Sequence, residues 1–395
     1  MDIKDKIWNL MLKNRRTFGP YQYTVPSTDS YPYQWLWDSC FHAIILLYFN
    51  IEDAKKELLS LVSHQFENGM IPHMIYWDKS ESGDFPVIEW GREDTSTITQ
   101  PPMLAFAAYA IYQKDGDKNF LVKIYPNLKR FYNYFINERD PRRNHLIGII
   151  NPDESGEDNS PRFDITLKLP SKHDFKLNFD KRLELVSKHS SYNFEIGTYM
   201  RNLFWVKDVP FNVIMVKNLD CLSKIAKILG FLKDSEYFSN QQIEISKAME
   251  KLMFEDGLFW STFGLDYQKI KVKTWAIFAP LFAKLYSERQ VEILLRKFLH
   301  NKNEFKTNYI VPTVSKDEVS YNPKDFWRGP VWIAVNWFIF KGLINYGLKE
   351  EAKEVADASF KLLKKSGFRE WFNPDTGEGL GAKEFTWGGL VLDMI

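Results

Sequence analysis

The fold class follows from residues 38–66, which read DSCFHAIILLYF (38–49), NIE (50–52) and DAKKELLSLVSHQF (53–66). The last segment carries apolar side chains at helical spacing, so they would line one face of a helix. This face consists of Ala54, Leu58, Leu59, Leu61, Val62 and Phe66. Because a link of a few residues makes two helices antiparallel, the stretch predicts a helical hairpin.

The hairpin pattern recurs along the chain. Apolar periodicity, with helix start and stop signals, predicts about twelve helices. We expect them at 3–15, 38–49, 53–66, 101–113, 118–138, 209–229, 235–253, 273–286, 289–300, 329–346, 350–366 and 386–395. Short links alternate with long connections, and alternate connections of an up-down array lie at opposite ends. The long connections should therefore meet on one face, where function is expected.

The two ends of this array are expected to meet. An open solenoid would show similar hairpins and polar terminal units. The hairpins here are not copies of one another, and residues 385–395 are apolar enough to need burial. We therefore predict an all-α fold of about six hairpins, closed into one double ring over 1–395. The connection 139–208 is unusually long, so it must either carry its own structure or act as a lid.

Composition limits the class of partner. The chain has 52 basic and 51 acidic residues, and this balance disfavours a nucleic acid or an anionic membrane as partner. Cys40 and Cys221 form no disulfide framework, and the N-terminus lacks an apolar signal sequence. Neither the histidines nor the glycines have the spacing of a zinc or nucleotide site. We expect a cytoplasmic protein that binds a small, neutral or weakly charged molecule without a metal or cofactor.

An acidic cluster lies at 151–162, which reads NPDESGEDNSPR. Four carboxylates within six positions repel one another, so at least one should keep its proton near neutral pH and could act as a general acid. A solvated loop or a calcium site would show a similar composition. The helix-loop-helix spacing of calcium ligands is missing, however.

A second acidic candidate is Glu370, within FREWFNP (368–374) and shortly before GEGLG (377–381). Arg369 beside it would favour the ionised carboxylate. An ionised glutamate and a protonated aspartate form the pair that glycoside hydrolysis needs, one to activate water and one to protonate the leaving oxygen. Taken alone, Glu370 would be interpreted as an ordinary exposed glutamate.

Tryptophans in loop-like segments predict an aromatic-lined pocket, because a buried indole still needs a partner for its N–H group. They are Trp35, Trp37, Trp77, Trp90, Trp327 and Trp371. In the segment YPYQWLWDS (31–39), Asp38 could either grip paired sugar hydroxyls or cap the apolar helix that follows. Proline at helix starts explains Pro101 and Pro330 but not Gln100 or Arg328.

Five motifs, in this order, resemble those of glycoside hydrolase family 63. They are WLWDS (35–39), QPP (100–102), ESGEDNSPR (154–162), FWRGPVW (326–332), and EWFNP (370–374) through FTW (385–387). Within that family the compact mannosylglycerate and glucosylglycerate hydrolases are most similar, with the trehalases more distant. The resemblance implies a single (α/α)6 toroidal catalytic domain, with 139–208 inserted in it. It also implies inverting cleavage of a small α-linked glucoside or mannoside, such as a mannosylglycerate, a glucosylglycerate or an α-glucobiose.

The same resemblance implies roles for individual residues. Asp158 matches the general acid and Glu370 the general base. Residues matched to sugar binding are Trp37, Asp38, Gln100 and Gly156, with His73 and Glu378 added by likeness to the trehalases. His73 stands where trehalases have asparagine, which argues against trehalose as substrate. The remaining expected pocket residues are Tyr33, Trp35, Trp327, Arg328, Trp332 and Trp387.

Two other functions fit the same architecture. A sugar epimerase would need histidines as acid and base on the loop face, where His42, His64 and His73 are the candidates. A noncatalytic carbohydrate-binding protein would bind sugar without turnover. For a carboxylate on the substrate, the candidate cations are Arg162, Arg201 and Arg328.

Overall fold

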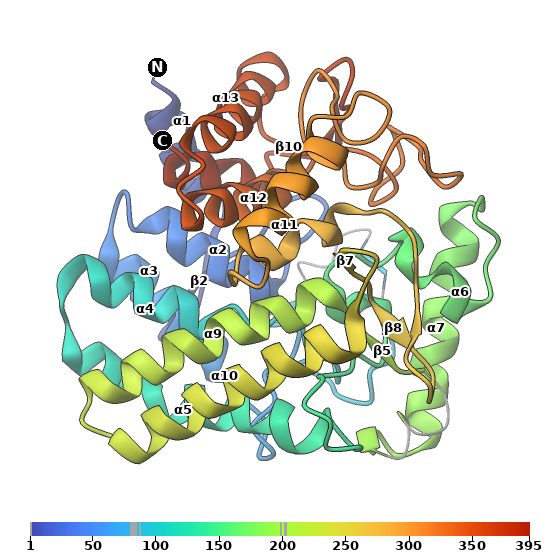
Figure 1. The fold of residues 1–395 in the computed structure, drawn as a ribbon. Helices are drawn as coiled ribbons and strands as arrows, with labels where there is room; N and C mark the ends of the chain where they lie inside the picture. The colour runs from blue at the N-terminus through green and yellow to red at the C-terminus, as the bar shows by residue number, and fades with distance from the viewer. Residues whose placement is uncertain (1, 80–84, 87, 198–199, 201–203) are drawn as a thin grey trace.

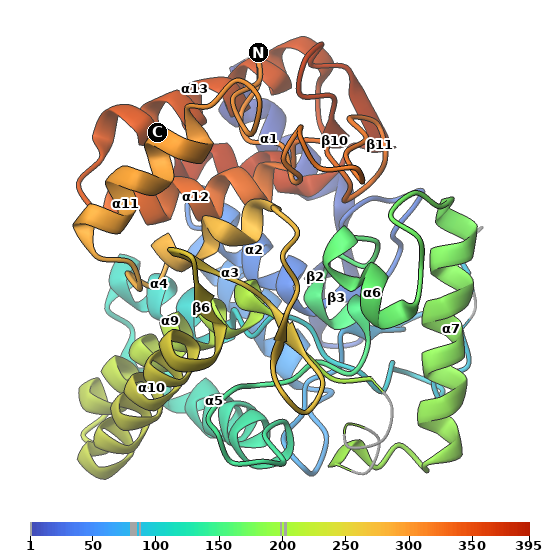
Figure 2. The same ribbon diagram turned by 45° about the vertical axis from the view of Figure 1, so that its right-hand side comes forward.

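The computed structural model describes residues 2–79, 85–86, 88–197, 200 and 204–395. Most of these residues form helices that pair as hairpins (Figures 1 and 2). The pairs are α2 (Leu36–Leu46) with α3 (Ile51–Val62), α4 (Leu104–Asp115) with α5 (Lys118–Glu138), α9 (Val209–Ile228) with α10 (Leu232–Met253), and α12 (Ile333–Asn345) with α13 (Lys349–Ser366). The predicted all-α fold is confirmed.

Six segments form an inner ring, and each contacts the next. In order they are α2, α4, α9, the 3-10 turn η5 (Ala279–Leu281), α12 and the 3-10 helix η7 (Thr386–Asp393), which returns to α2. Outside this ring, α1 (Ile3–Asn14) packs on η7, and α3, α5, α10 and α13 pack on their hairpin partners. This closed double ring is the predicted (α/α)6 toroid.

Burial explains which helix takes which layer. Every residue of the inner helix α2 is buried, as its nearly continuous apolar sequence requires. The outer helix α3 turns an apolar face inward, with Ala54, Leu58, Leu61 and Val62 buried. Three of its charged side chains, Asp53, Lys55 and Glu57, are buried as well. Asn50 ends the link between the two helices, because its side chain accepts hydrogen bonds from the amides of Glu52 and Asp53. The quoted stretch therefore folds as the predicted hairpin.

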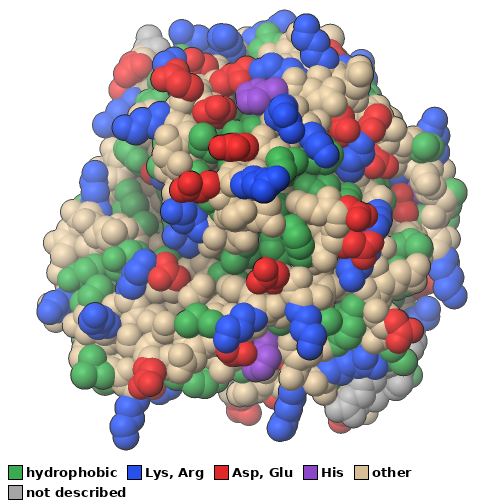
Figure 3. All heavy atoms as spheres, in the orientation of Figure 1, with side chains coloured by type: hydrophobic (Ala, Val, Ile, Leu, Met, Phe, Trp, Pro, Cys, Tyr) green, Lys and Arg blue, Asp and Glu red, His purple; other side chains and the backbone are tan. Residues whose placement is uncertain are grey.

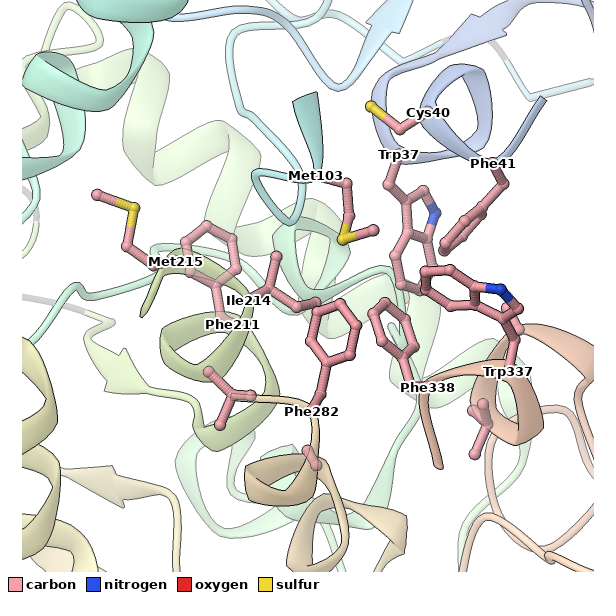
Figure 4. Close-up of a cluster of buried hydrophobic side chains, with 14 of the residues drawn as sticks. Trp37, Cys40, Phe41, Met103, Phe211, Ile214, Met215, Phe282, Trp337 and Phe338 are labelled. Carbon is pink, nitrogen blue, oxygen red and sulfur yellow. The ribbon is translucent and has the colours of Figure 1, made fainter. Parts of the chain in front are cut away.

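Aromatic side chains fill the centre of the ring (Figure 4). Phe41 on α2 lies 5.9 Å from both Trp337 and Phe338 on α12, measured between ring centroids. Phe282, just after η5, lies 5.1 Å from Phe338. Trp37 lies 5.3 Å from Phe41 and also lines the pocket described below. The centre of the ring is therefore packed with side chains in the part of the chain that the structure describes.

Two of the predicted helices are not α-helical. Residues 273–286 contain the 3-10 turns η4 (Trp275–Ile277) and η5, because Pro280 lacks the amide hydrogen that an α-helix needs. Residues 386–395 form the 3-10 helix η7, in which Gly388 and Gly389 lower α-helical propensity. Between these segments, α11 (Glu288–Leu294) continues as one π-helical turn, Leu295–Leu299.

The long segment 139–208 carries its own structure, the first of the two predicted alternatives. It contains η2 (Pro152–Ser155), η3 (Pro161–Phe163), α6 (Asp164–Leu167) and α7 (Phe175–Ser191), followed by β5 (Val206–Lys207). Helix α7 was not predicted. It stands at the edge of the molecule in both ribbon views, outside the ring of hairpins.

Short antiparallel strands form hairpins within the long connections and, in some cases, join one connection to another. They are β1 (Arg15–Phe18) with β2 (Tyr21–Thr24), β3 (Gln34–Trp35) with β4 (Met74–Ile75), β5 with β8 (Thr262–Phe263) and β9 (Gln268–Lys269), β6 (Phe254–Glu255) with β7 (Leu258–Phe259), and β10 (Arg369–Phe372) with β11 (Gly379–Lys383). Two of these pairings, β3 with β4 and β10 with β11, lie beside the pocket described below.

The surface carries charges of both signs. Lysine and arginine side chains alternate with aspartate and glutamate over the face in Figure 3. None of the helices in the described part of the chain combines the length and the apolar character needed to cross a membrane.

Candidate active site

A pocket of about 570 Å³ opens among the long connections. Its wall comes from segments far apart in the chain. The sequence-predicted residues in it are Trp35, Trp37, Asp38, His73, Trp90, Gln100, Gly156, Asp158, Trp327, Trp332, Glu370 and Trp387. The two predicted catalytic carboxyl groups therefore face the same pocket, and its other predicted residues are mainly aromatic.

Residues 151–162, called the acid loop below, present Asp158 to this pocket. Two glutamates of the loop, Glu154 and Glu157, are fully buried and anchor it to the core. Arg139 donates to both carboxylate oxygens of Glu154, at 2.8 and 2.6 Å. Arg162 donates to both oxygens of Glu157, at 2.9 and 3.0 Å. These paired charges explain why the predicted repulsion among the four carboxylates does not unfold the loop.

The other two carboxylates of the loop share one cation. Arg182, from α7, donates from Nη1 to Asp153 Oδ1, and the same Nη1 lies 3.2 Å from Asp158 Oδ2. All three side chains line the pocket. Burial raises the pKa of Asp158, and the adjacent Arg182 opposes this rise.

Glu370 lies opposite, on β10, where its side chain points inward and is nearly completely buried. The hydroxyl of Tyr31 donates to Oε1 at 2.7 Å, and the amide of Ala382 on β11 donates to Oε2 at 2.8 Å. Burial raises the pKa of Glu370 to about 8, and the negative charge of Asp158 adds to the rise. The two donors lower the pKa but do not cancel these effects.

The expected ionisation of Glu370 by its neighbour Arg369 is therefore wrong. Successive residues of a strand point to opposite sides, and Arg369 donates instead to the carbonyl of Gly381 at 2.7 Å. The burial of Glu370, which raises its pKa, therefore outweighs any effect of Arg369.

Trp37 and Asp38 form the floor of the pocket. Helix α2 begins at Leu36 with Trp35 as its N-cap residue, so Asp38 lies inside the first turn and does not cap the helix. Its Oδ1 accepts a hydrogen bond of 2.7 Å from the indole of Trp387. Burial raises the pKa of Asp38 to about 6. Among the described residues, no other side chain donates a hydrogen bond to this carboxylate, so its second oxygen is available to a ligand hydroxyl.

Gly156 brings the acid loop against this floor. It has a left-handed backbone, with φ of +72°, and a Cβ atom there would lie only 2.2 Å from the ring of Trp37. The amide of Trp37 in turn donates to Gln100 Oε1 at 3.3 Å. These two contacts hold the acid loop, α2 and the segment around Gln100 close together.

Stacked indoles form one side wall. The rings of Trp327 and Trp332 lie 3.8 Å apart and are parallel within 5°. Trp387 lies 5.4 Å from Trp332 and also packs against Trp37. Such a surface suits the apolar face of a sugar ring. Two of the predicted tryptophans do not line the pocket: Trp77 stacks on Tyr23, and Trp371 stacks on Trp332.

Three other predicted site residues do not line the pocket. Tyr33 packs behind Trp35 in a separate aromatic cluster. Arg328 is buried and donates to both oxygens of Asp164, at 3.0 and 2.8 Å. Glu378 is exposed and lies 3.3 Å from the ammonium group of Lys324. Sequence position alone did not distinguish these supporting residues from the pocket wall.

The carboxylate-binding candidates are also corrected. Arg162 is occupied by Glu157 and Asp208, and Arg328 by Asp164. Arg201 lies outside the described residues. The cation that does line the pocket, Arg182, was not predicted.

The comparisons with known proteins agree with this geometry. A family model described as "Mannosylglycerate hydrolase MGH1-like glycoside hydrolase domain" matches residues 31–388. The chain belongs to this family of glycoside hydrolases.

Similar proteins cover almost the whole hydrolase. A mannosylglycerate hydrolase from Thermus thermophilus is 32% identical, over 93% of this chain and 95% of that one. A glucosylglycerate hydrolase from Mycolicibacterium hassiacum is 26% identical, over 92% of each. A crystal structure of the family 63 mannosylglycerate hydrolase from Thermus thermophilus, in complex with Tris and D-glycerate, has a TM-score of 0.91 and 31% identity. It covers 100% of this chain and 99% of that one.

A more distant structure shows the fold alone. The neutral trehalase from Saccharomyces cerevisiae is 17% identical and has a TM-score of 0.60 over 95% of the hydrolase and 74% of the trehalase. This likeness is consistent with the toroid described above.

The histidines do not form an acid–base pair in the hydrolase. His73 lines the pocket, but burial lowers its pKa to about 3, and Nδ1 lies 2.6 Å from the hydroxyl of Ser96. His42 lies in the core beside Thr386, and His64 lies in a separate surface hollow. The predicted epimerase alternative therefore lacks its second group in this pocket.

Several pocket residues were missed by sequence reasoning. They are Tyr31, Asp153, Phe175, Phe179 and Arg182. The last three lie on α7. No local sequence pattern predicted that this helix approaches the acid loop. Tyr31 did lie in a quoted motif, and its position beside the tryptophans was the available signal.

The described residues also contain no cluster of three or more histidines, cysteines or carboxylates that could hold a metal ion.

Proposed function

We propose that the hydrolase cleaves a small α-linked mannoside or glucoside with inversion, with Asp158 as general acid and Glu370 as general base. The observation that carries this proposal is the meeting of these two carboxyl groups, from distant segments, in one aromatic-lined pocket. Paired carboxyl groups on two sides of a glycosidic bond are what the inverting reaction requires. The substrates named for the similar hydrolases support the choice of small glycosides.

In the proposed reaction, the carboxyl proton of Asp158 passes to the glycosidic oxygen while the bond between that oxygen and the anomeric carbon breaks. Glu370 takes a proton from a water molecule, whose oxygen attacks the anomeric carbon from the opposite face. The aglycone leaves as an alcohol and the sugar with inverted configuration. The proton on Glu370 is then released to solvent, and Asp158 takes one up.

The surrounding residues suggest how the sugar is held. Asp38 has a carboxylate oxygen free for a hydroxyl, and the indole of Trp387 fixes the other one. We assign the sugar to the space between Asp38, Gln100, Gly156 and the stacked Trp327 and Trp332. Trp35 and Trp37 complete this aromatic site.

Arg182 supports an acidic aglycone such as glycerate. Among the described residues of the pocket wall, it is the one lysine or arginine. A guanidinium group pairs well with a carboxylate. The D-glycerate in the crystal structure of the Thermus thermophilus protein makes this ligand the first to test.

The larger organisation is proposed on the same grounds. We regard 1–395 as one catalytic domain, with 139–208 inserted as a cover of the pocket, because Phe175, Phe179 and Arg182 of α7 form part of the wall.

We also place the enzyme in the cytoplasm, where its two buried free thiols, Cys40 and Cys221, would stay reduced.

A substrate screen with two variants tests the proposal. We expect hydrolysis of mannosylglycerate or glucosylglycerate in preference to trehalose, kojibiose and nigerose. Asp158→Asn and Glu370→Gln should each lower kcat by about 10³-fold or more, because each removes a proton transfer, while circular dichroism stays unchanged. Near-normal turnover in either folded variant, or no hydrolysis of any of these α-glycosides, would contradict the assignment.

A further inference from the structure

Arg182 is held among groups of opposite charge at the edge of the acid loop. Its Nη1 contacts both Asp153 and Asp158, and its Nε donates to Asn178 Oδ1 at 2.9 Å. Its side chain is only 5% exposed, so water screens these charges poorly. Arg182, Asp153 and Asp158 are called the trio below. The protonation states of the trio therefore depend mainly on these three groups and on any ligand that binds beside them.

This arrangement works against the proposed role of Asp158. A general acid must hold its proton, but a positive charge within about 4–6 Å lowers the pKa of an aspartate by about 1–3. Asp158 also faces Tyr31 and Glu370 across the pocket, and Asp153 within its own loop. Arg182 is the one cation among these neighbours. It favours the ionised, inactive form of the acid.

We propose that binding of a carboxylate-bearing aglycone is coupled to proton uptake by Asp158, and that Arg182 and Asp153 carry this coupling. The inference rests on the proposed function. When both aspartates are ionised, the trio has one net negative charge. The carboxylate of a ligand beside Arg182 would add a second net negative charge in a buried site, unless an aspartate takes up a proton.

Asp158 is the aspartate that should be protonated. Asp153 is held by the closer contact with Nη1, whereas Asp158 Oδ2 lies 3.2 Å from the same nitrogen. The ligand carboxylate would compete with Asp158 for Arg182, so the weaker of the two contacts is lost first. An acidic aglycone would thereby prepare its own general acid, and a neutral aglycone would leave Asp158 ionised.

The same coupling would help the product leave. Once Asp158 has given its proton to the glycosidic oxygen, it is ionised again while the acidic alcohol still lies beside Arg182. Three carboxylates then surround one guanidinium group. Their repulsion would weaken the hold on the product, so release would follow proton transfer.

Proton uptake can be measured directly by titration calorimetry with D-glycerate. The protein is the full chain carrying Glu370→Gln, whose neutral side chain cannot exchange a proton and whose turnover is expected to be negligible. Titrations at pH 7 in buffers of low and high ionisation enthalpy give the number of protons bound. We expect roughly one proton per D-glycerate, and much weaker binding of glycerol, the neutral probe. Glu370→Ala serves as a second background.

Further substitutions in this background identify the groups. Asp153→Asn removes one negative charge, so uptake should fall close to zero and D-glycerate should bind about tenfold more tightly. Asp158→Asn should also abolish uptake. Asp29→Asn is the matched control, because Asp29 is an exposed carboxyl group at the pocket rim without a contact to Arg182, and uptake should persist. In ¹³C spectra of aspartate-labelled protein, the resonance that moves to the protonated position should be absent from Asp158→Asn.

Three results would overturn the coupling: D-glycerate binding without proton uptake, no D-glycerate binding, or a protonated resonance that belongs to Asp153. The proposed function is tested separately by turnover of the wild-type enzyme. Hydrolysis of α-glycosides together with any of these results would leave that function standing and remove only the coupling.

Discussion

Glu370 is nearly completely buried and the side chain of Asp158 is 21% exposed, and the two carboxyl groups have different neighbours. Asp158 has a guanidinium group beside it, whereas Glu370 has two neutral donors, Tyr31 and the amide of Ala382. Burial raises the pKa of Glu370 to about 8, whereas the proposed mechanism needs this carboxyl group in its ionised form. The proposed mechanism needs the proton on Asp158 instead, so residues that shift the balance between these two protonation states should change the rate.

Tyr31 should tune this balance. Its hydroxyl bond stabilises the ionised form of Glu370, and burial raises the pKa of Tyr31 so that the hydroxyl stays protonated. In wild type, kcat/KM should fall as pH rises through about 8, because the last proton of the pair is then lost. In Tyr31→Phe the pKa of Glu370 rises further. The high-pH limb should therefore move upward, and kcat/KM near pH 7 should fall roughly tenfold.

This prediction is checked by pH profiles of kcat/KM from pH 5 to 10. Tyr76→Phe is the control, because Tyr76 packs on Tyr33 and does not contact Glu370. An unchanged high-pH limb in Tyr31→Phe would show that the hydroxyl does not act on Glu370.

At the scale of elements, the acid loop depends on its close approach to α2. Gly156→Ala would place a methyl group 2.2 Å from Trp37 and strain a backbone with φ of +72°. The loop must shift away from the pocket floor, and an error of about 1 Å in a catalytic group can cost about 100-fold in rate. We expect kcat/KM to fall by about that factor.

Gly230→Ala provides the matched control for this change. Gly230 has φ of +83°, in the link between α9 and α10, and nothing lies within 4 Å of an added Cβ atom. Gly230→Ala should lose about 1–2 kcal/mol of stability in urea unfolding from backbone strain alone, and Gly156→Ala should lose more, because its methyl group also clashes with Trp37. Comparable kcat/KM in the two variants would argue against the role given to the contact between Gly156 and Trp37.

The elements that could be predicted are those whose packing requires a regular spacing of apolar residues in the sequence. The amphipathic α3 and the apolar α2 did so, because one buries a face and the other its whole surface. The segments η5 and η7 are buried like helices, and their apolar residues therefore suggested α-helix. Their proline and glycines decided the local backbone instead.

Helix α7 shows why part of the site could not be predicted. Its contribution to the pocket is one arginine and two phenylalanines, rather than a continuous apolar face. The pairing of Arg182 with Asp153 and Asp158 joins segments about 25 residues apart through charge, and no sequence period records such a contact. The two proposed catalytic carboxyl groups, Asp158 and Glu370, by contrast, lie in motifs dense enough to single out.

At the scale of the whole molecule, closure of the ring brings the two halves of the site together. Helix η7 returns to α2, where Trp387 meets Asp38 and Thr386 meets His42. This return places β10 and Glu370 beside Tyr31. The acid loop reaches the same pocket from the middle of the chain. An open array of the same hairpins would leave these groups apart.

The central claim is that this closed arrangement hydrolyses an α-glycoside by direct attack of water on the anomeric carbon. Proton NMR of the wild-type reaction, recorded from the first turnovers on the best substrate of the screen, tests it most directly. The account predicts that the β-anomer of the released sugar appears first and that the α-anomer grows in later by mutarotation. The α-anomer as first product would contradict the account.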